Sequence, residues 1–260
     1  MAIKQSAMIK LSVVIITFNE EQNIKRCLES VKEVADEIVV LDSFSTDNTE
    51  AICKNYGVKF FTHTFDGHIQ QKNRAITYAS SPYILSVDAD EALSEELKRS
   101  ILQKKKNWDA DGYTLNRLTN YCGKWIHHCG WYPDRKLRLF DSRKGKWAGL
   151  NPHDKYFMDK GAVVKHLKGD LLHYSYYTVE QHHQQTEKFS TIAAKSLFDK
   201  GKKTSFLNIW FSPLIRFIRD YFFNLGFLDG KTGLTICLIS AGGTKKKYQK
   251  LKKLKKQDRR

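Results

Sequence analysis

A fourfold alternation of strand-like and helix-like segments over residues 11–106 constrains the fold more than any other feature of the sequence. The expected strands are apolar runs at Leu11–Thr17, Glu37–Asp42, Val58–Phe61 and Tyr83–Asp88. The expected helices follow them at 24–31, 46–56, 70–80 and 94–106. Strands that lack polar alternation are typical of a parallel sheet that is covered on both faces. We therefore predict an α/β fold with a mostly parallel central sheet and helices on both faces.

The rest of the chain, after the fourth repeat, has a different character. Further strands are expected at Gly112–Thr119 and Lys136–Phe140, separated by a loop rich in Trp, Tyr and His. A helical region begins near Val179 and ends in a lysine-rich tail. A chain of 260 residues is long enough for one sizeable α/β domain and an appendage. We therefore expect an α/β domain over residues 8–178 and a helical, basic region over 179–260.

The positive charge is concentrated at the C-terminal end of the sequence. Residues 245–260 carry ten Lys or Arg and one Asp, a net charge of +9 out of the total of +16. Before this tail, residues 204–225 place apolar side chains at helical spacing, interrupted by Pro213 and by charges such as Arg216. An apolar helix of this kind beside a basic tail is typical of a segment that lies on an anionic membrane surface. The alternative is a helix that packs on the α/β domain or in a dimer.

The cysteines and the N-terminal residues favour a reducing compartment. The five cysteines are odd in number and scattered, unlike those of a disulfide framework. The first apolar run is followed by acids and has no small-residue cleavage site, so we interpret it as a strand and not as a signal peptide. No uncharged apolar stretch has the length that a transmembrane helix needs. We expect a cytoplasmic protein that is peripheral on the inner face of the cytoplasmic membrane.

Two aspartates, Asp88 and Asp90, stand at the end of the fourth expected strand, in "YILSVDADEAL". In an extended chain, side chains two residues apart point to the same side, so both carboxylates can address one cation. Such oxygen ligands suit Mg²⁺ or Mn²⁺, which join them to the phosphates of a substrate. The alternative is an acidic turn in which Asp90 and Glu91 begin the next helix. The position favours the metal, because ligands bind beyond the carboxyl ends of parallel strands.

Other polar residues near the strand ends are compatible with a nucleotide. Asp42 ends the second expected strand and can accept a hydrogen bond from a base N–H or a ribose hydroxyl. It can equally organise the following turn together with Asp47. Lys72 and Arg74 would bring positive charge near a nucleotide, although each alone is more typical of a solvated helix residue.

Four ordered motifs occupy the first two thirds of the chain: "LSVVIITFNEEQNIKRCLESV", "EIVVLDSFSTDNTEAI", "QKNRAI" and "YILSVDADEAL". Together they resemble those of the inverting family 2 glycosyltransferases with the GT-A fold, and the resemblance covers about residues 10–175. Three later segments, "WYPDRKLRLF", "NPHDKY" and "LLHYSY", resemble a subgroup typified by lipopolysaccharide core β-1,4-glucosyltransferases. The resemblance implies a GT-A nucleotide-diphospho-sugar transferase fold, here with a C-terminal helical, basic extension.

The resemblance also assigns residues to a donor site. Those implied at the nucleotide are Thr17, Asn19, Glu20, Asp42 and Lys72 or Arg74. Asp88 and Asp90 are implied at the metal, Mg²⁺ or Mn²⁺, and at the diphosphate. His173 could approach the metal or the diphosphate, or be a hydrogen-bonded core histidine.

The expected general base is Asp154, because the subgroup has His-Glu where this chain has His153-Asp154. Asp134 is the competing candidate, and its alternative role is a structural salt bridge with Arg135 or Arg138. A further set of polar residues, Cys122, His127, His128 and Cys129, lacks a CxxC pair. We expect that set to form an acceptor-side loop and not a zinc site.

These features predict a metal-dependent glycosyltransferase. It would move a sugar with inversion from a nucleotide-sugar donor, expected to be a UDP-sugar, to a hydroxyl of a cell-envelope glycan or glycolipid. The base takes the proton of the acceptor hydroxyl as it attacks the anomeric carbon, through a transition state like an oxocarbenium ion. A sugar nucleotidyltransferase is the alternative enzyme. A nucleic-acid-binding protein would explain the basic tail but not acids at three strand ends, so we expect no nucleic acid as partner.

Overall fold

The structure is a computed structural model that describes residues 8–150 and 153–258. The chain forms two compact units. The first contains Met1–Arg117 and Asp134–Tyr174, and the second contains Leu118–Pro133 and Ser175–Arg260. This division differs from the expected one after residue 178 in two respects: residues 118–133 group with the helical part of the chain, and that part begins again at Ser175.

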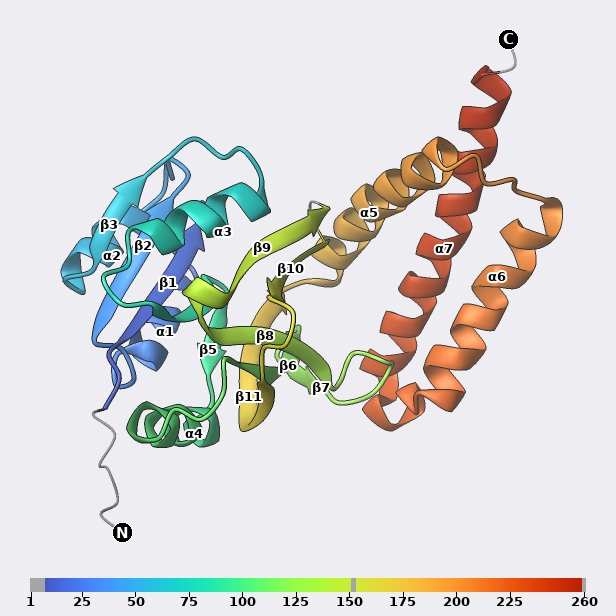
Figure 1. Cartoon of the computed structure of the whole chain (residues 1–260). Helices are drawn as coiled ribbons and strands as arrows, with labels where there is room; N and C mark the ends of the chain where they lie inside the picture. Colours follow the sequence, from blue (N-terminus) through green and yellow to red (C-terminus); the bar gives the residue numbers. More distant parts are fainter. Residues whose placement is uncertain (1–7, 151–152, 259–260) are drawn as a thin grey trace. The chain divides into compact units, whose positions relative to one another are not determined.

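The first unit is built on a mixed sheet with the strand order β3-β2-β1-β4-β8-β6-β11-β5 (Figure 1). Its parallel strands are β1 (Leu11–Thr17), β2 (Glu37–Asp42), β3 (Lys59–Thr62) and β4 (Tyr83–Asp88). The other strands are β5 (Glu91–Leu93), β6 (Gly112–Tyr121), β8 (Asp134–Asp141) and β11 (Val164–Tyr176). Antiparallel pairs join β4 to β8, β8 to β6 and β11 to β5. The parallel order that the alternation predicts therefore holds for β1 to β4 only.

Helices and a hairpin cover the two faces of this sheet. On one face, α1 (Ile24–Val31), α2 (Thr49–Asn55) and α4 (Glu95–Lys106) contribute to the larger apolar core. On the other face, α3 (His68–Thr77) packs with the hairpin of β9 (Gly145–Leu150) and β10 (His153–Met158) (Figure 1). A short 3₁₀ turn, Ser142–Lys144, leads from β8 into this hairpin. The carboxyl ends of β1, β2 and β4 therefore lie at one edge, as predicted for a ligand site.

The second unit consists of helices together with β7 (Lys124–Ile126), which pairs with β6. Its helices are α5 (Val179–Asp199), α6 (Phe206–Ile218), a π-helical turn (Arg219–Phe223), a 3₁₀ turn (Gly226–Asp229) and α7 (Gly230–Asp258). Capping boxes at Thr178 and Ser205 begin α5 and α6. Within the described residues, no single helix has the length and apolar character to cross a membrane, whereas the bent pair Phe206–Phe223 and Gly226–Asp258 meets both criteria together.

Candidate active site

A lysine and an arginine compensate the carboxylate of Asp88 at the end of β4. Lys72 Nζ, from α3, lies 3.0 Å from Asp88 Oδ1, and Arg138 Nη2, from β8, lies 2.6 Å from Asp88 Oδ2. Burial alone would raise the pKa of Asp88, but the Arg138 and Lys72 cations hold it well below its usual range. Asp88 is therefore ionised at the edge of the sheet where a donor is expected.

The same lysine reaches the expected general base. Lys72 Nζ lies 2.9 Å from Asp154 Oδ2, and only 6% of the Lys72 side chain is exposed. Its ammonium also lies 4.5 Å from the centroid of the Trp147 ring, close enough for a cation–π contact. Lys72 thus connects β4 to the β9–β10 hairpin, and it brings two sequence-predicted residues, Asp88 and Asp154, to one cation.

The hairpin that carries Asp154 is fastened to α3 next to Lys72. The Trp147 backbone N–H donates to Asn73 Oδ1 at 3.0 Å, and Asn73 Nδ2 donates to the Trp147 carbonyl at 2.9 Å. The Trp147 ring is buried against Phe140 and Tyr156. These contacts hold Asp154 near the strand edge although it lies far from Asp88 in the sequence.

Glu91 has a different role from the one that the sequence indicates. It does not begin the helix that follows β4, because it lies in β5, is 1% exposed and pairs across the sheet with His173. Its Oε1 accepts a hydrogen bond from Arg138 Nη2 at 3.0 Å, and its Oε2 accepts one from the Asp88 backbone N–H at 2.9 Å. Glu91 therefore orients Arg138 and the Asp88 backbone from inside the sheet.

Arg138 is the site residue that the sequence analysis did not place in the site. It is 4% exposed, and its Nε and Nη1 atoms are buried without a hydrogen-bond partner. Its guanidinium carbon lies 5.5 Å from the centroid of the Trp147 ring. The available signal was the position of Arg138 in "KLRLF", on the side of the strand that faces inward. A single sequence does not distinguish an arginine that is buried in an antiparallel strand from one that is solvated.

Asp90 has its own partner and does not share those of Asp88. The chain leaves β4 at Asp88, and residues 89–90 form a turn, so the extended spacing assumed for the pair does not continue. Asp90 Oδ2 lies 3.1 Å from Nε2 of His173 on β11. The Nδ1 atom of His173 is buried without a hydrogen-bond partner. The structure thus places His173 beside the Asp-x-Asp motif through Asp90, and this contact is compatible with both roles considered for it, the metal site and a hydrogen-bonded core histidine.

Glu20 lies near these acids and is partly buried after β1. Burial raises its pKa to about 7, with further increases from Asp90, Asp47 and Asp88, whereas a hydrogen bond from Asn23 opposes the shift. Near neutral pH, Glu20 is therefore balanced between its neutral and ionised forms. A cation bound among these acids would favour the ionised form.

The remaining candidates at β1 and β2 hold a turn in this structure. Both Asp42 oxygens accept hydrogen bonds from Ser45, from its backbone N–H at 2.7 Å and its hydroxyl at 2.5 Å. Asn19 has φ 53°, and its Oδ1 accepts a hydrogen bond from the Thr46 backbone N–H at 2.8 Å. Thr17 lies opposite Asp42, and its buried hydroxyl has no hydrogen-bond partner. Because this turn occupies residues 43–48, α2 begins at Thr49, three residues later than expected.

Two candidates bind partners other than those considered. Arg74 lies two residues after Lys72 on α3 and pairs with Asp66 at 3.1 Å, apart from the acids of the site. Asp134 pairs with Arg117 at 2.7 Å and with Lys136 at 3.0 Å. A structural ion pair for Asp134 was one of the two predicted roles, but its expected partners, Arg135 and Arg138, were wrong.

The donor set fits a divalent cation only in part. The described residues contain no group of three or more His, Cys, Asp and Glu side chains arranged to hold a metal ion. The charge of Asp88 is already balanced by Lys72 and Arg138, which leaves Asp90 and His173 as the ligands best able to accept a metal. Asp90 supplies a carboxylate oxygen, which suits Mg²⁺ and Mn²⁺, whereas the imidazole nitrogen of His173 is more typical of zinc, copper or iron sites.

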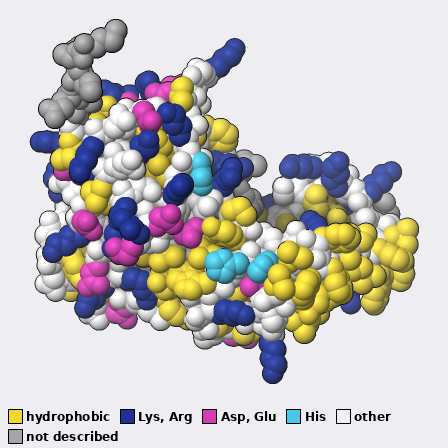
Figure 2. All heavy atoms as spheres, turned by 90° about the horizontal axis from the view of Figure 1, so that it is seen from below, with side chains coloured by type: hydrophobic (Ala, Val, Ile, Leu, Met, Phe, Trp, Pro, Cys, Tyr) yellow, Lys and Arg dark blue, Asp and Glu magenta, His cyan; other side chains and the backbone are white. Residues whose placement is uncertain are grey.

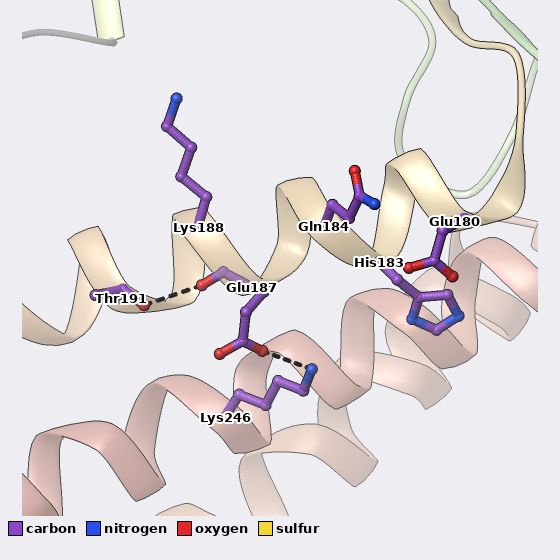
Figure 3. A pocket seen from close by; sticks show the side chains of 7 residues that line it. All are labelled: Glu180, His183, Gln184, Glu187, Lys188, Thr191 and Lys246. Carbon is purple, nitrogen blue, oxygen red and sulfur yellow. Dashed lines mark hydrogen bonds and ion pairs between the residues drawn. The ribbon is translucent and has the colours of Figure 1, made fainter.

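The second unit contains a separate groove between α5 and α7 (Figure 3). Its volume is about 550 Å³, and its lining is polar: Glu180, His183, Gln184, Glu187, Lys188, Thr191 and Lys246. Glu187 and Lys246 form an ion pair across it at 2.7 Å. None of the predicted site residues lines this groove.

Comparisons with known proteins agree with the fold, which is that of a glycosyltransferase of the GT-A class. The model of the family described as glycosyl transferase family 2 matches residues 12–163. The chain belongs to this family, whose members invert the configuration of the sugar that they transfer, and the predicted resemblance is confirmed.

Curated relatives match most of the chain. An uncharacterized glycosyltransferase of Rickettsia bellii is 30% identical over 258 residues, which covers 94% of this chain and 87% of the relative. A lipopolysaccharide core biosynthesis glycosyltransferase of Rhizobium meliloti is 29% identical over 249 residues, covering 89% and 90%.

Solved structures match less of the chain. Staphylococcus aureus TarS is similar at a TM-score of 0.39 and 17% identity, covering 71% of this chain and 39% of its own. Glucosyl-3-phosphoglycerate synthase of Mycobacterium tuberculosis is similar at a TM-score of 0.36 and 20% identity, covering 43% and 44%. The match spans less than half of either solved chain.

Proposed function

We propose that this glycosyltransferase moves a sugar from a nucleoside diphosphate donor, a UDP-sugar, to a hydroxyl of a cell-envelope glycan or glycolipid of the lipopolysaccharide core type. One observation carries the proposal: Lys72 contacts both Asp88 and Asp154, so one cation connects the expected diphosphate site to the expected base. The Rhizobium relative, named for lipopolysaccharide core biosynthesis, supports the choice of acceptor class.

In the proposed reaction, the residues around Asp88 and Asp154 perform three tasks. Asp154 accepts the proton of the acceptor hydroxyl as its oxygen attacks the anomeric carbon from the face opposite the diphosphate, which inverts the configuration. Lys72 and Arg138 provide positive charge where the leaving diphosphate gains negative charge. The buried Glu91 keeps Arg138 oriented toward that position.

A divalent cation, Mg²⁺ or Mn²⁺, belongs to this proposal. Asp90 and His173 would hold it, with Asp88 beside them. When bound, it would supply Lewis-acid stabilisation of the diphosphate leaving group. Removal of metal with a chelator should abolish transfer, and Mg²⁺ or Mn²⁺ should restore it; full activity after chelation would remove metal dependence from the proposal.

The test compares Asp154→Asn with Asp134→Asn. Each substitution removes one negative charge, but only Asp154 contacts Lys72. We expect Asp154→Asn to lower kcat about 10²- to 10⁴-fold with the affinity for UDP retained, as for the loss of a general base. Asp134→Asn should keep kcat within roughly tenfold.

The readout is the release of UDP and the formation of glycosylated acceptor, with a panel of sugar nucleotides as donors. If Asp154→Asn transfers sugar at the wild-type rate, Asp154 is not the base. Release of pyrophosphate from a nucleoside triphosphate and a sugar phosphate would instead indicate a nucleotidyltransferase.

A further inference from the structure

The second unit leaves an unusual number of large apolar side chains exposed. Those of α6 and the turns after it are Phe206, Leu207, Trp210, Phe211, Leu214, Ile215, Ile218, Phe222, Phe223, Leu225, Phe227 and Leu228. The exposed fraction reaches 67% at Phe206 and 79% at Phe223. Figure 2 shows hydrophobic side chains gathered over the side of the molecule where α6 and α7 lie. We call the surface formed by these residues the apolar face.

The spacing shows that α6 has apolar side chains on two sides, and that the apolar face lies on one of them. Leu207, Phe211, Leu214 and Ile218 recur at intervals of three and four residues, so they share one side of α6. Ile209, on another side, is 7% exposed and packs into the unit. Water-exposed apolar surface of this extent marks a site of contact with a protein or a membrane.

Charges beside the apolar face indicate which of these partners it contacts. Lys245 of α7 holds its ammonium 4.3 Å from the centroid of the Trp210 ring. Further along α7, Lys252, Lys253 and Lys256 are exposed, whereas Lys246 and Lys250 are bound to Glu187 of α5. Aromatic and aliphatic side chains with lysines at their border are complementary to the apolar interior and anionic headgroups of a bilayer.

The charges within the apolar segment agree with a position at the membrane surface. Arg216 and Arg219 both pair with Asp220, at 2.7 and 2.8 Å, and the Asp220 side chain is only 5% exposed. Asp220 faces inward, whereas the Arg216 and Arg219 side chains are 41% and 57% exposed, and Phe222 and Phe223 next to them are exposed as well. Exposed arginines beside exposed aromatic rings are suited to the membrane interface, where the cations can meet anionic headgroups.

We propose that the apolar face docks the enzyme on an anionic membrane, with α6 and the two following turns inserted shallowly and the lysines of α7 against the headgroups. This proposal concerns the second unit alone and stands whether or not the proposed sugar transfer is correct. Docking would hold the enzyme at the membrane surface, in the same plane as a glycolipid acceptor.

The experiment is flotation of the full-length protein with lipid vesicles. Vesicles contain either neutral phosphatidylcholine alone or about 30% phosphatidylglycerol. We expect strong binding to the anionic vesicles and loss of most of it at about 0.5 M KCl, where the Debye length falls to a few ångströms. Phe211→Ser with Leu214→Ser should weaken binding about tenfold or more, and Lys252→Gln, Lys253→Gln and Lys256→Gln together should weaken it about 10- to 100-fold.

The matched control is Val163→Ser with Val164→Ser, which removes two exposed apolar side chains from the first unit. It should bind vesicles like the wild type. Circular dichroism and thermal denaturation show whether each variant is folded. Equal binding to neutral and anionic vesicles would overturn the proposal. A dimer would also overturn the proposal, if analytical ultracentrifugation shows that Phe211→Ser with Leu214→Ser converts it to a monomer and vesicle binding does not change. A second copy of the chain would then cover the apolar face.

Discussion

At the scale of single residues, Lys72 is the cation that contacts both Asp88 and Asp154. It is 5% exposed and lies within 3.0 Å of both Asp88 and Asp154. Lys72→Met would leave two neighbouring, partly buried carboxylates with less compensation, which raises the pKa of Asp88 and removes positive charge from the diphosphate position. We expect kcat to fall about 10²-fold or more and the thermal transition to fall as well.

The matched control for Lys72 is Arg74→Met on the same helix. It removes a cation whose partner is Asp66 and not an acid of the site. Steady-state kinetics and thermal denaturation on both variants separate the two roles. Equal losses of kcat in the two variants would mean that the contacts of Lys72 with Asp88 and Asp154 have no special part in catalysis.

Glu20 should make the free energy of unfolding depend on pH. Its pKa is raised to about 7 by burial and by the acids around it, against 4.5 for an ordinary Glu. The folded state therefore holds a proton that the unfolded state loses, so the unfolding free energy falls as pH rises from about 4.5 to 7 and is level above that. Glu20→Gln removes this loss. In EDTA, the variant should exceed the wild type by about 1–3 kcal/mol at pH 8 and match it near pH 4.

Urea denaturation at several pH values checks this prediction. The exposed Glu96→Gln serves as the control and should stay within about 0.5 kcal/mol of the wild type at every pH. A constant stability difference for Glu20→Gln between pH 4 and pH 8 would contradict a raised pKa at Glu20.

At the scale of elements, local patterns predicted the strands and helices that depend on local sequence. The bounds of β1, α1, β2 and β4 agree with the expected ranges, because each is a continuous apolar run or a clear helical repeat. The sequence did not predict β5 or the β9–β10 hairpin. The strand β5 has only three residues and is defined by its pairing with β11, about eighty residues later in the chain. A local sequence pattern does not reveal such a distant partner.

The same reason explains which parts of the site could be predicted. Asp88, Lys72 and Asp154 came from motifs, whereas their convergence on one ammonium depends on how the hairpin packs on α3. Glu91 looked like a helix start because its burial follows from a neighbouring strand and not from its own surroundings in the sequence.

Gly169 tests the packing of β11 on α4. Its φ is +92°, and a Cβ there would lie 2.3 Å from the Leu97 backbone nitrogen, at the first turn of α4. Gly161 has a similar φ of +88° with nothing within 4 Å. We expect Gly161→Ala to cost about 1 kcal/mol from backbone strain alone. Gly169→Ala should cost about 3 kcal/mol or more, because backbone atoms must move. Similar unfolding free energies for the two variants in urea titration would rule out this close approach.

At the scale of the whole molecule, the two units share the chain in an interleaved way. The first unit contains every residue proposed to act on the donor or the acceptor hydroxyl. The second unit takes residues 118–133, which are the end of β6 and the segment that leads to β8, and adds the end of β11 and the helices that follow it. Its core joins Ile126 and Cys129 of the inserted segment to Ile236 and Cys237 of α7. Evolution or design could therefore change the helical unit without altering the site, but only if the inserted segment is kept covered.

Truncation distinguishes this division from the one predicted at residue 178. A chain that ends at residue 178 keeps 118–133 but loses its partners, among them Asp229, which accepts hydrogen bonds from the His128 backbone N–H at 3.0 Å and from Lys124 at 2.6 Å. Ile126 and Cys129, now 0% and 3% exposed, would face water, and uncovered core of this kind favours aggregation.

We expect the chain that ends at residue 178 to elute from size exclusion as aggregate, or to melt well below the full-length protein. A chain that ends at Leu251 loses residues 252–260 and keeps the apolar core cluster of the second unit, because the α7 residues of that cluster, Ile236 and Cys237, lie before the cut. It should elute as the full-length protein does, with a thermal transition within about 3 °C of the wild type. If the shorter chain is instead monomeric, with the transition of the intact protein, then residues 118–133 need no helical partner, and the chain divides at residue 178 as its sequence indicates.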